Sequence, residues 1–167
     1  MVGGFMTKEA LGDMIVQDVD RWYRITKTIL KEDVDCEDAV SEAIVKGFAK
    51  IHTLKQDEYV KTWFTRILIN ECYNILRRQG REMAYDEQLS EREIQKNDIG
   101  EKDYSDLYQN MMTLSDDYRI PLLLYYVEGF KINEIAQLLE LKENTVKMRL
   151  SRGRIKLRRL FEQEDVI

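Results

Sequence analysis

The 167-residue sequence has few of the residues that interrupt helices or build covalent and metal sites. A single proline and eight glycines favour long helices over a turn-rich β fold. The two cysteines, Cys36 and Cys72, are far apart and form no C-x-x-C pair, so neither a disulfide framework nor a zinc ribbon is indicated. We interpret His52, the only histidine, as a surface or helix-end residue, and we expect no metal and no cofactor.

The sequence also lacks the segments that insert a protein into a membrane or build a lone active site. No apolar run approaches the roughly 18 residues that a membrane span requires. The N-terminus lacks the basic-then-apolar order of a secretory signal, so we expect a cytoplasmic protein without direct membrane insertion. There is no G-x-S-x-G motif, no Gly-rich phosphate loop and no nucleophile with an evident base. We therefore predict that the protein is not an enzyme.

What the sequence does have is charge that is segregated along the chain. The net charge is -5, and charged residues make up 34% of the sequence. Between residues 141 and 160, eight lysines and arginines stand against one acidic residue. Between residues 82 and 106, nine acidic residues stand against three basic ones. This separation predicts two basic binding surfaces on either side of an acidic connector.

Two amphipathic helices joined by a tight turn are predicted between Leu122 and Phe161. Apolar residues at helical spacing mark the first helix at Ile132, Ile135, Ala136 and Leu139, and the second at Val146, Leu150, Gly153, Leu157 and Phe161. Lysines and arginines surround the second stripe. Such a helix gains affinity by displacing counterions from phosphates, and side chains near its N-terminus can reach base edges. The pair predicts a DNA-reading element, and the alternative is a basic face that is merely solvated.

The N-terminal half predicts three helices. The first runs from Met14 to Leu30 with one broad apolar face and ends in the segment KEDVD; the second has a buried stripe from Ala39 to Ile51; the third spans Val60 to Arg78. Asp35, Asp38 and Glu42 share the polar face of the second helix. Like charges at this spacing are unfavourable in an isolated helix, so they are either helix-dipole partners or a docking surface for a basic partner. Dipole placement does not account for Glu42, which favours docking.

The polar face of the third helix interleaves amides, aromatic rings and cations. These residues are Arg66, Asn70, Tyr73, Asn74 and Arg77, with Lys61, Trp63 and Arg78 close by. Rings can stack on unpaired bases while amides bond to base edges and cations hold phosphates. The spacing therefore suits single-stranded nucleic acid. The alternative is that Trp63 and Tyr73 are core aromatics and that the arginines only solubilise the helix.

The C-terminal half begins after a polar, acidic stretch. We interpret residues 81–103 as a linker with little structure of its own. From Tyr104 a helix resumes, and Ser115 can cap the next one, whose LLLYYV run (122–127) is apolar on all sides and predicted to be central to the core. Pro121 must lie near that helix's first turn or bend it. Gly129 is predicted to be a left-handed C-cap.

The order of these motifs resembles a known family. An acidic D-x-x-x-E helix (38–42) precedes W-F-x-R-I-x-x-N (63–70), the acidic linker, L-S-D-D-Y-R, Y-Y-V-E-G, E-I-A-x-L-L and T-V-K-x-R-L-x-R-G-R. This order and spacing is similar to that of the extracytoplasmic-function (ECF) sigma factors of the sigma-70 family, the small two-domain initiation factors of bacterial RNA polymerase. The similarity covers nearly the whole chain and rests on two independent motif sets.

The resemblance implies an all-α protein of two small helical domains on a flexible acidic linker. Residues 1–80 would form a region 2-like bundle, residues 81–103 the linker, which would thread toward the polymerase active-site cleft, and residues 104–167 a region 4-like helix-turn-helix domain. The protein would bind the β′ and β subunits of core RNA polymerase and direct it to promoter DNA in the bacterial cytoplasm. A cognate anti-sigma factor, often membrane-anchored in the family, would mask both DNA-binding faces.

The resemblance also assigns roles to residues. Core polymerase, through a coiled coil of β′, would be bound by Asp35, Asp38, Ser41 and Glu42. The minus-10 element would be opened and read by Lys61, Trp63, Arg66, Asn70, Tyr73, Asn74, Arg77 and Arg78. The minus-35 element would be read by Asn144, Thr145, Lys147, Met148, Arg149, Ser151 and Arg152. We expect Arg149 and Arg152 to share one face, opposite the buried stripe, and to meet duplex DNA together.

Three residues depart from the family pattern. Ser41 stands where the family usually has Gln. Lys131 replaces the usual Ser or Thr cap before the first helix of the pair, and losing that cap costs about 1 kcal/mol unless another group substitutes. Glu140 occupies a turn position usually held by Gly. Its backbone is strained if its φ is positive, and the alternative is a rearranged turn that avoids this strain. None of the three touches the basic recognition face.

Two rival functions belong to other classes. A free-standing helix-turn-helix regulator would bind duplex DNA by itself, usually as a dimer on a repeated half-site. The acidic face of the second helix and the base-stacking face of the third argue against it. A helical nuclease is disfavoured because the sequence has no compact carboxylate or histidine metal cluster.

Overall fold

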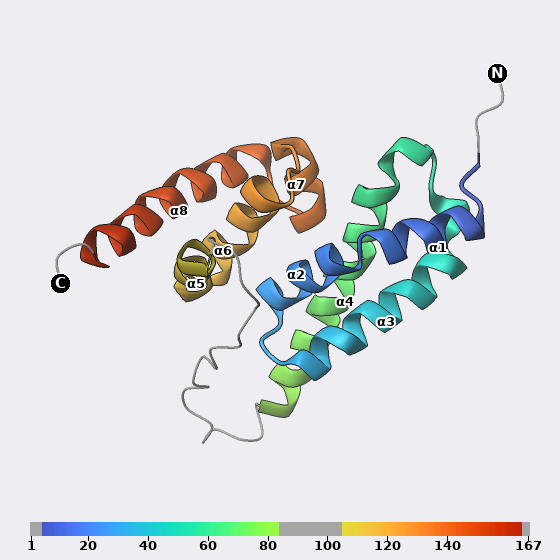
Figure 1. Ribbon diagram of the computed structural model, residues 1–167, viewed down its shortest axis with the longest axis horizontal. Coiled ribbons are helices and arrows are strands. Elements are labelled where there is room, and N and C mark those ends of the chain that lie inside the picture. Colours follow the sequence, from blue (N-terminus) through green and yellow to red (C-terminus); the bar gives the residue numbers. More distant parts are fainter. Residues whose placement is uncertain (1–4, 84–104, 165–167) are drawn as a thin grey trace. The chain divides into compact units, whose positions relative to one another are not determined.

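The computed structural model describes residues 5–83 and 105–164, and every element in these two ranges is helical (Figure 1). The chain divides into two compact units, whose described parts are these same two ranges. The prediction of an all-α protein with two small helical domains is confirmed. The predicted linker lies largely outside the described residues, although the third predicted helix extends past Arg78 as far as Met83. No helix within the described ranges is both long and apolar enough to cross a membrane.

The first unit is a bundle of four α-helices. Its elements are α1 (Lys8–Gln17), α2 (Val19–Ile29), α3 (Asp33–Ala49), the short 3-10 turns η1 (Ile51–Thr53) and η2 (Asp57–Tyr59), and α4 (Val60–Met83). The core is centred on Trp22 and Phe64, whose rings meet edge-on with centroids 4.9 Å apart. A Cβ added at Gly47 of α3 would lie 3.2 Å from the Phe64 ring. The missing side chain therefore lets α3 pack closely along α4.

The prediction of one helix from Met14 to Leu30 is wrong, because the chain breaks at Asp18 between α1 and α2. Asp18 leaves helical geometry at φ -104° and ψ 22°. Ile15 and Trp22 are buried on either side of the break, so the apolar period continued across it, whereas Val19 is 40% exposed. The Trp22 indole N–H donates to the Ile15 carbonyl at 3.1 Å and links the two helices.

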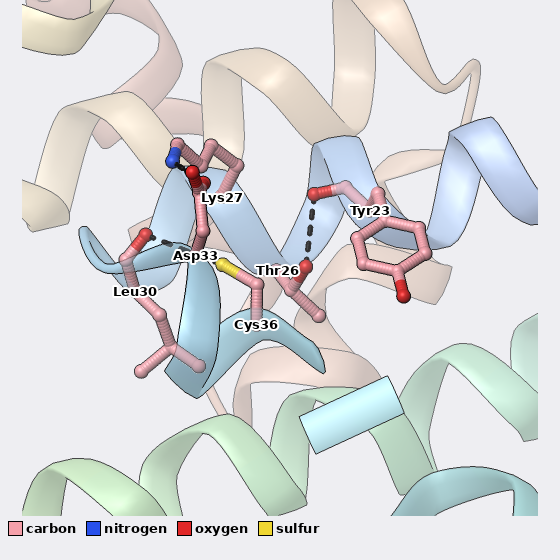
Figure 2. Close-up of polar contacts among 6 residues, drawn as sticks. All are labelled: Tyr23, Thr26, Lys27, Leu30, Asp33 and Cys36. Atoms are coloured by element: carbon pink, nitrogen blue, oxygen red, sulfur yellow. Dashed lines mark hydrogen bonds and ion pairs between the residues drawn. The ribbon is translucent and has the colours of Figure 1, made fainter. Parts of the chain in front are cut away.

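A short corner between α2 and α3 positions the acidic helix. The Thr26 hydroxyl donates to the Tyr23 carbonyl at 2.8 Å, and the Cys36 thiol lies 3.8 Å from the Leu30 carbonyl. Lys27 pairs with Asp33 in the same corner (Figure 2). The helix before the segment KEDVD ends at Ile29, as predicted, and α3 begins within the segment at Asp33.

The far end of α3 also differs from the prediction. Ile51, expected at the end of the buried stripe, lies beyond the last residue of α3, in η1, and is only half-buried.

The two cysteines pack in the helical core of this unit. Burial raises the pKa of both the Cys36 and the Cys72 thiol, so each stays protonated at neutral pH.

The second unit contains α5 (Ser105–Thr113), α6 (Asp116–Leu122), the π-helical turn η3 (Leu123–Val127), α7 (Ile132–Leu139) and α8 (Glu143–Glu164). Pro121 lies inside α6, just before the π turn, where its missing N–H removes one helical hydrogen bond. Leu122, Leu123 and Leu124 are buried as predicted.

The end of this segment is only partly as predicted. The prediction that the LLLYYV run is buried on all sides is wrong for Tyr126 and Val127, which are 54% and 43% exposed. The wider π turn changes the direction in which its side chains point. Gly129 has a φ of 75°, which confirms the left-handed cap.

The turn between α7 and α8 keeps its left-handed residue despite the missing glycine. Glu140 has φ 55° and ψ 45°, so the strained conformation is confirmed and the turn is not rearranged. The Leu141 N–H donates to the Ala136 carbonyl at 2.9 Å and closes the end of α7. At the other end of α7, the Glu134 carboxylate accepts from the Lys131 N–H at 2.8 Å, which supplies half of a capping box that a lysine side chain cannot complete.

Candidate nucleic-acid interface

The polar face of α4 is the first candidate surface. Among its predicted minus-10 residues, Lys61, Arg66, Asn70, Arg77 and Arg78 are exposed, and Trp63, Tyr73 and Asn74 are half-buried. At about 100° per residue, Arg66, Asn70 and Arg77 lie opposite the buried Phe64, Leu68 and Cys72. Lys61 falls on the other side of the helix and forms an ion pair with Asp18 at 3.0 Å. Arg66, Asn70 and Arg77 thus share one face of α4, with Trp63, Tyr73, Asn74 and Arg78 on the same face or at its edges, and Lys61 lies apart.

Neither ring of this face, Trp63 or Tyr73, belongs to the buried core. The Trp63 indole N–H donates to the Thr53 hydroxyl of η1 at 3.0 Å, which fixes the ring against the segment that precedes α4. Trp63 and Tyr73 are absent from the buried core, where Trp22 and Phe64 are the fully buried aromatics. Both rings therefore keep surface that can meet a ligand.

A polar groove of about 630 Å³ runs between α3 and α4. Its lining consists of Asp38, Ser41, Glu42, Lys46, Glu71, Asn74, Arg77 and Arg78. Three predicted polymerase-binding residues and three predicted minus-10 residues therefore share one groove. The helical period predicted one polar face on α3 and another on α4, but it could not predict that these two faces line the same groove.

Two lining residues, Lys46 and Glu71, were missed by the sequence analysis. They form an ion pair across the groove, and the Glu71 side chain is only 7% exposed. The fourth predicted docking residue, Asp35, lies outside the lining and accepts a hydrogen bond from the Gln79 side chain of α4 at 2.6 Å. A charged residue on an otherwise buried helix stripe is the sequence signal that could have identified Glu71.

The N-terminal half of α8 is the second candidate surface. Of its predicted minus-35 residues, Asn144, Lys147, Met148, Ser151 and Arg152 are exposed, and Thr145 and Arg149 are half-buried. Val146 and Leu150 are buried, as predicted, but Arg149 lies beside this stripe rather than opposite it. The Arg149 guanidinium lies 3.3 Å from the Asp117 carboxylate of α6, whereas Arg152 is exposed. The two arginines, predicted to act as a pair, are therefore held differently.

Further along α8, tyrosines hold two more cations. The Arg154 guanidinium donates to the Tyr126 hydroxyl at 2.8 Å, and the Lys156 ammonium lies 5.3 Å from the centre of the Tyr118 ring. Tyr126 belongs to the π turn and Tyr118 to α6. These contacts fasten the middle of α8 to the elements before it, which leaves the exposed residues of its first turns for a ligand.

Comparisons with known proteins match both units. The family model for sigma-70 region 2 matches residues 14–82, and the model for sigma-70 region 4 matches residues 105–157. The chain is 29% identical over 160 residues to the RNA polymerase sigma factor SigV of Bacillus subtilis (strain 168), with 96% of each chain covered. It is 23% identical to the ECF RNA polymerase sigma factor SigW of the same organism, with 91% of this chain and 89% of SigW covered. The chain belongs to the sigma-70 family, among its extracytoplasmic-function members.

Solved structures agree with the fold of this sigma factor. The sigma factor RpoE from Bartonella quintana, crystallised in complex with the anti-sigma factor NepR, superposes with a TM-score of 0.79 at 24% identity and covers 93% of this chain and 98% of its own. CnrH, in complex with the cytosolic domain of CnrY, superposes with a TM-score of 0.66 at 18% identity and covers 94% of this chain and 90% of its own.

The family fixes the general activity of this sigma factor. It is a transcription initiation factor that binds core RNA polymerase and directs it to promoters, and it is not an enzyme. The free-standing regulator is not favoured, because the region 2 match accounts for the first unit, which such a regulator would not need.

Proposed function

We propose that the two units of this sigma factor handle DNA in two different states. The first unit, residues 1–80, docks on core polymerase through α3 and binds unpaired bases of the minus-10 element through α4. The second unit, residues 104–167, reads the duplex minus-35 element through α8. The acidic residues 81–103 join the two.

The observation that carries the proposal is the chemical difference between the two exposed faces. On α4, half-buried rings and an amide alternate with exposed cations, which suits bases that have left the stack. On α8, the first turns carry exposed cations and small polar side chains on the side opposite a buried stripe, which suits a major groove.

The docking role falls to Asp38, Ser41 and Glu42, which line the groove, and to Asp35 beside it. Asp38, Ser41 and Glu42 are exposed and can meet a partner without rearrangement. We further propose that an anti-sigma factor regulates the protein in the cytoplasm of its bacterium, because the RpoE structure is a complex with such a factor.

Replacing Tyr73 with Ala tests the first unit. The holoenzyme should lose open-complex formation by roughly 1–3 kcal/mol if a base stacks on the ring, and duplex minus-35 binding should be spared. Tyr23→Ala, at an exposed ring of α2, is the matched control. Equal binding of wild type and the Tyr73 variant to a template with a pre-melted minus-10 bubble, with unchanged fork-junction footprints, would refute the role of Tyr73.

Replacing Arg149 with Ala tests the second unit. If the guanidinium leaves Asp117 and reads a base, binding should fall by about 1–3 kcal/mol and preference should relax at one minus-35 position. Binding to a panel of minus-35 variants at several salt concentrations measures both effects. A phosphate contact would instead weaken all sequences alike and lower the salt slope by about one unit, which would remove Arg149 from base reading.

A further inference from the structure

We infer that Glu71 is a positioning residue for promoter recognition. Its carboxylate orients the Asn74 amide on the polar face of α4, which we propose binds the minus-10 element. Through Lys46, it also connects this face to the α3 side of the groove, which we propose binds polymerase. The inference rests on the proposed function of α3 and α4. It adds a residue that is expected to touch neither DNA nor polymerase.

The burial of Glu71 is the first observation. Its side chain is 7% exposed, while that of its partner Lys46 is 39% exposed. Removing a carboxylate from water is costly, and a buried ion pair is often no more stabilising than apolar residues of the same volume. Stability alone is therefore a weak reason for a charge at this position. A role in orienting neighbouring polar groups accounts for it better.

The order of donors and acceptors along α4 is the second observation. The Arg77 guanidinium donates to the Asn74 side-chain oxygen at 2.5 Å, and the Asn74 side-chain nitrogen lies 3.5 Å from the Glu71 carboxylate. A guanidinium can only donate and an ionised carboxylate can only accept, so these two neighbours fix which way the amide points. Without Glu71, the Asn74 nitrogen loses this acceptor, and only Arg77 still fixes the amide.

The shared groove is the third observation. Lys46 lies four residues after Glu42 on α3, so the two side chains lie on the same side of the helix, and both line the groove. Lys46, Glu71, Asn74 and Arg77 thus form a continuous polar chain from the wall expected to meet polymerase to the face expected to meet DNA. A partner that contacts Lys46 acts on the residue that orients Asn74.

Two substitutions at position 71 separate positioning from folding. Glu71→Met has a similar length but no charge and only a weakly accepting sulfur, and the freed Lys46 ammonium can extend into water because its side chain is already partly exposed. Glu71→Gln removes the charge but keeps a carbonyl oxygen that can accept from Asn74. Asp20→Met, at an exposed acid of α2, is the control for the loss of one negative charge.

The experiment measures binding of reconstituted holoenzymes to a fork-junction template with an unpaired minus-10 strand. Glu71→Met should weaken this binding about fivefold, as expected for one lost orienting hydrogen bond, and Glu71→Gln should stay within about twofold of wild type. The double variant Glu71→Met with Asn74→Ala should bind no more weakly than Asn74→Ala alone, because Glu71 acts through Asn74. Core-polymerase affinity, far-UV circular dichroism and Asp20→Met should match wild type.

Four results would overturn the inference. If Glu71→Met binds the fork as wild type does while Asn74→Ala is impaired, the positioning role fails and the proposed function stands. If Asn74→Ala also binds normally, the minus-10 role of Asn74 fails, and the inference fails with it. If the two losses add in the double variant, or if Glu71→Met loses helicity along with binding, Glu71 acts as an ordinary structural residue.

Discussion

Both units pack their functional helices through apolar contacts, but they differ in how the residues proposed to meet a ligand are held. In the first unit, α4 meets α3 across a polar groove, and the proposed contact residues are bonded to one another through Lys46, Glu71, Asn74 and Arg77. In the second unit, α8 packs on α6 and α7 through Val146, Leu150 and Gly153. A helix that reads base edges needs a fixed register, which close apolar packing supplies. A surface that meets both polymerase and unpaired bases can instead use a polar network that a partner is able to adjust.

The close packing of α8 can be broken at Gly153. A Cβ at this position would lie 2.9 Å from the Leu122 side chain, and Leu122 is itself 1% exposed. Gly153→Val should therefore destabilise the second unit by about 2 kcal/mol, as overpacking does. Gly80→Val in α4 is the matched control, because nothing lies within 4 Å of its added Cβ.

Urea unfolding can assign the loss to one unit. Both tryptophans, Trp22 and Trp63, lie in the first unit, so their fluorescence reports that unit alone, whereas far-UV circular dichroism reports both. Gly153→Val should shift part of the circular dichroism transition and leave the fluorescence transition unchanged. A shift of both would show that the two units do not unfold independently.

Charge reversal on the groove tests the polar unit. Asp38→Lys with Glu42→Lys should weaken association with core polymerase by about 1–2 kcal/mol, because like charges would then face a basic partner, and helicity should not change. Pull-down with core polymerase measures the effect, and Asp13→Lys with Asp20→Lys, both exposed on α1 and α2, is the matched charge control. Unchanged association together with unchanged circular dichroism would remove this wall from docking.

The smallest expected effect concerns the turn before α8. Glu140 adopts a left-handed conformation that costs a non-glycine residue about 1 kcal/mol, so Glu140→Gly should stabilise the second unit by about that amount. Gln137→Gly, at an exposed right-handed position of α7, should destabilise it by a similar amount. A thermal melt followed by circular dichroism distinguishes the two signs. A loss of stability in Glu140→Gly would show that the Glu140 side chain contributes more than its backbone strain costs.

The helices of this protein could be predicted where one apolar stripe faces one core. The spacing of Ile135 and Ala136, and of Val146 and Leu150, predicted α7, α8 and the faces that they bury. The break at Asp18 could not be predicted, because Ile15 and Trp22 keep a helical period across it. Exposure of Tyr126 depends on a π turn, which no periodicity encodes.

The candidate sites show the same division. Residue type and spacing predicted most of the exposed polar side chains of α3, α4 and α8, although Asp35, Trp63, Tyr73, Asn74, Thr145 and Arg149 are half-buried. They could not predict which residues form ion pairs between helices, because the Arg149–Asp117 and Lys46–Glu71 pairs depend on tertiary packing. The roles assigned to individual residues remain predictions.

We expect this chain to recognise promoters only as a subunit of RNA polymerase, which can be tested by measuring its DNA binding with and without core polymerase. With a net charge of -5, the free protein should bind a promoter duplex about as weakly as a random duplex at physiological salt. The holoenzyme should prefer the promoter by a factor on the order of 10³ or more. Tight, sequence-specific binding of the free full-length chain would show that it recognises promoters without polymerase, as a free-standing regulator does.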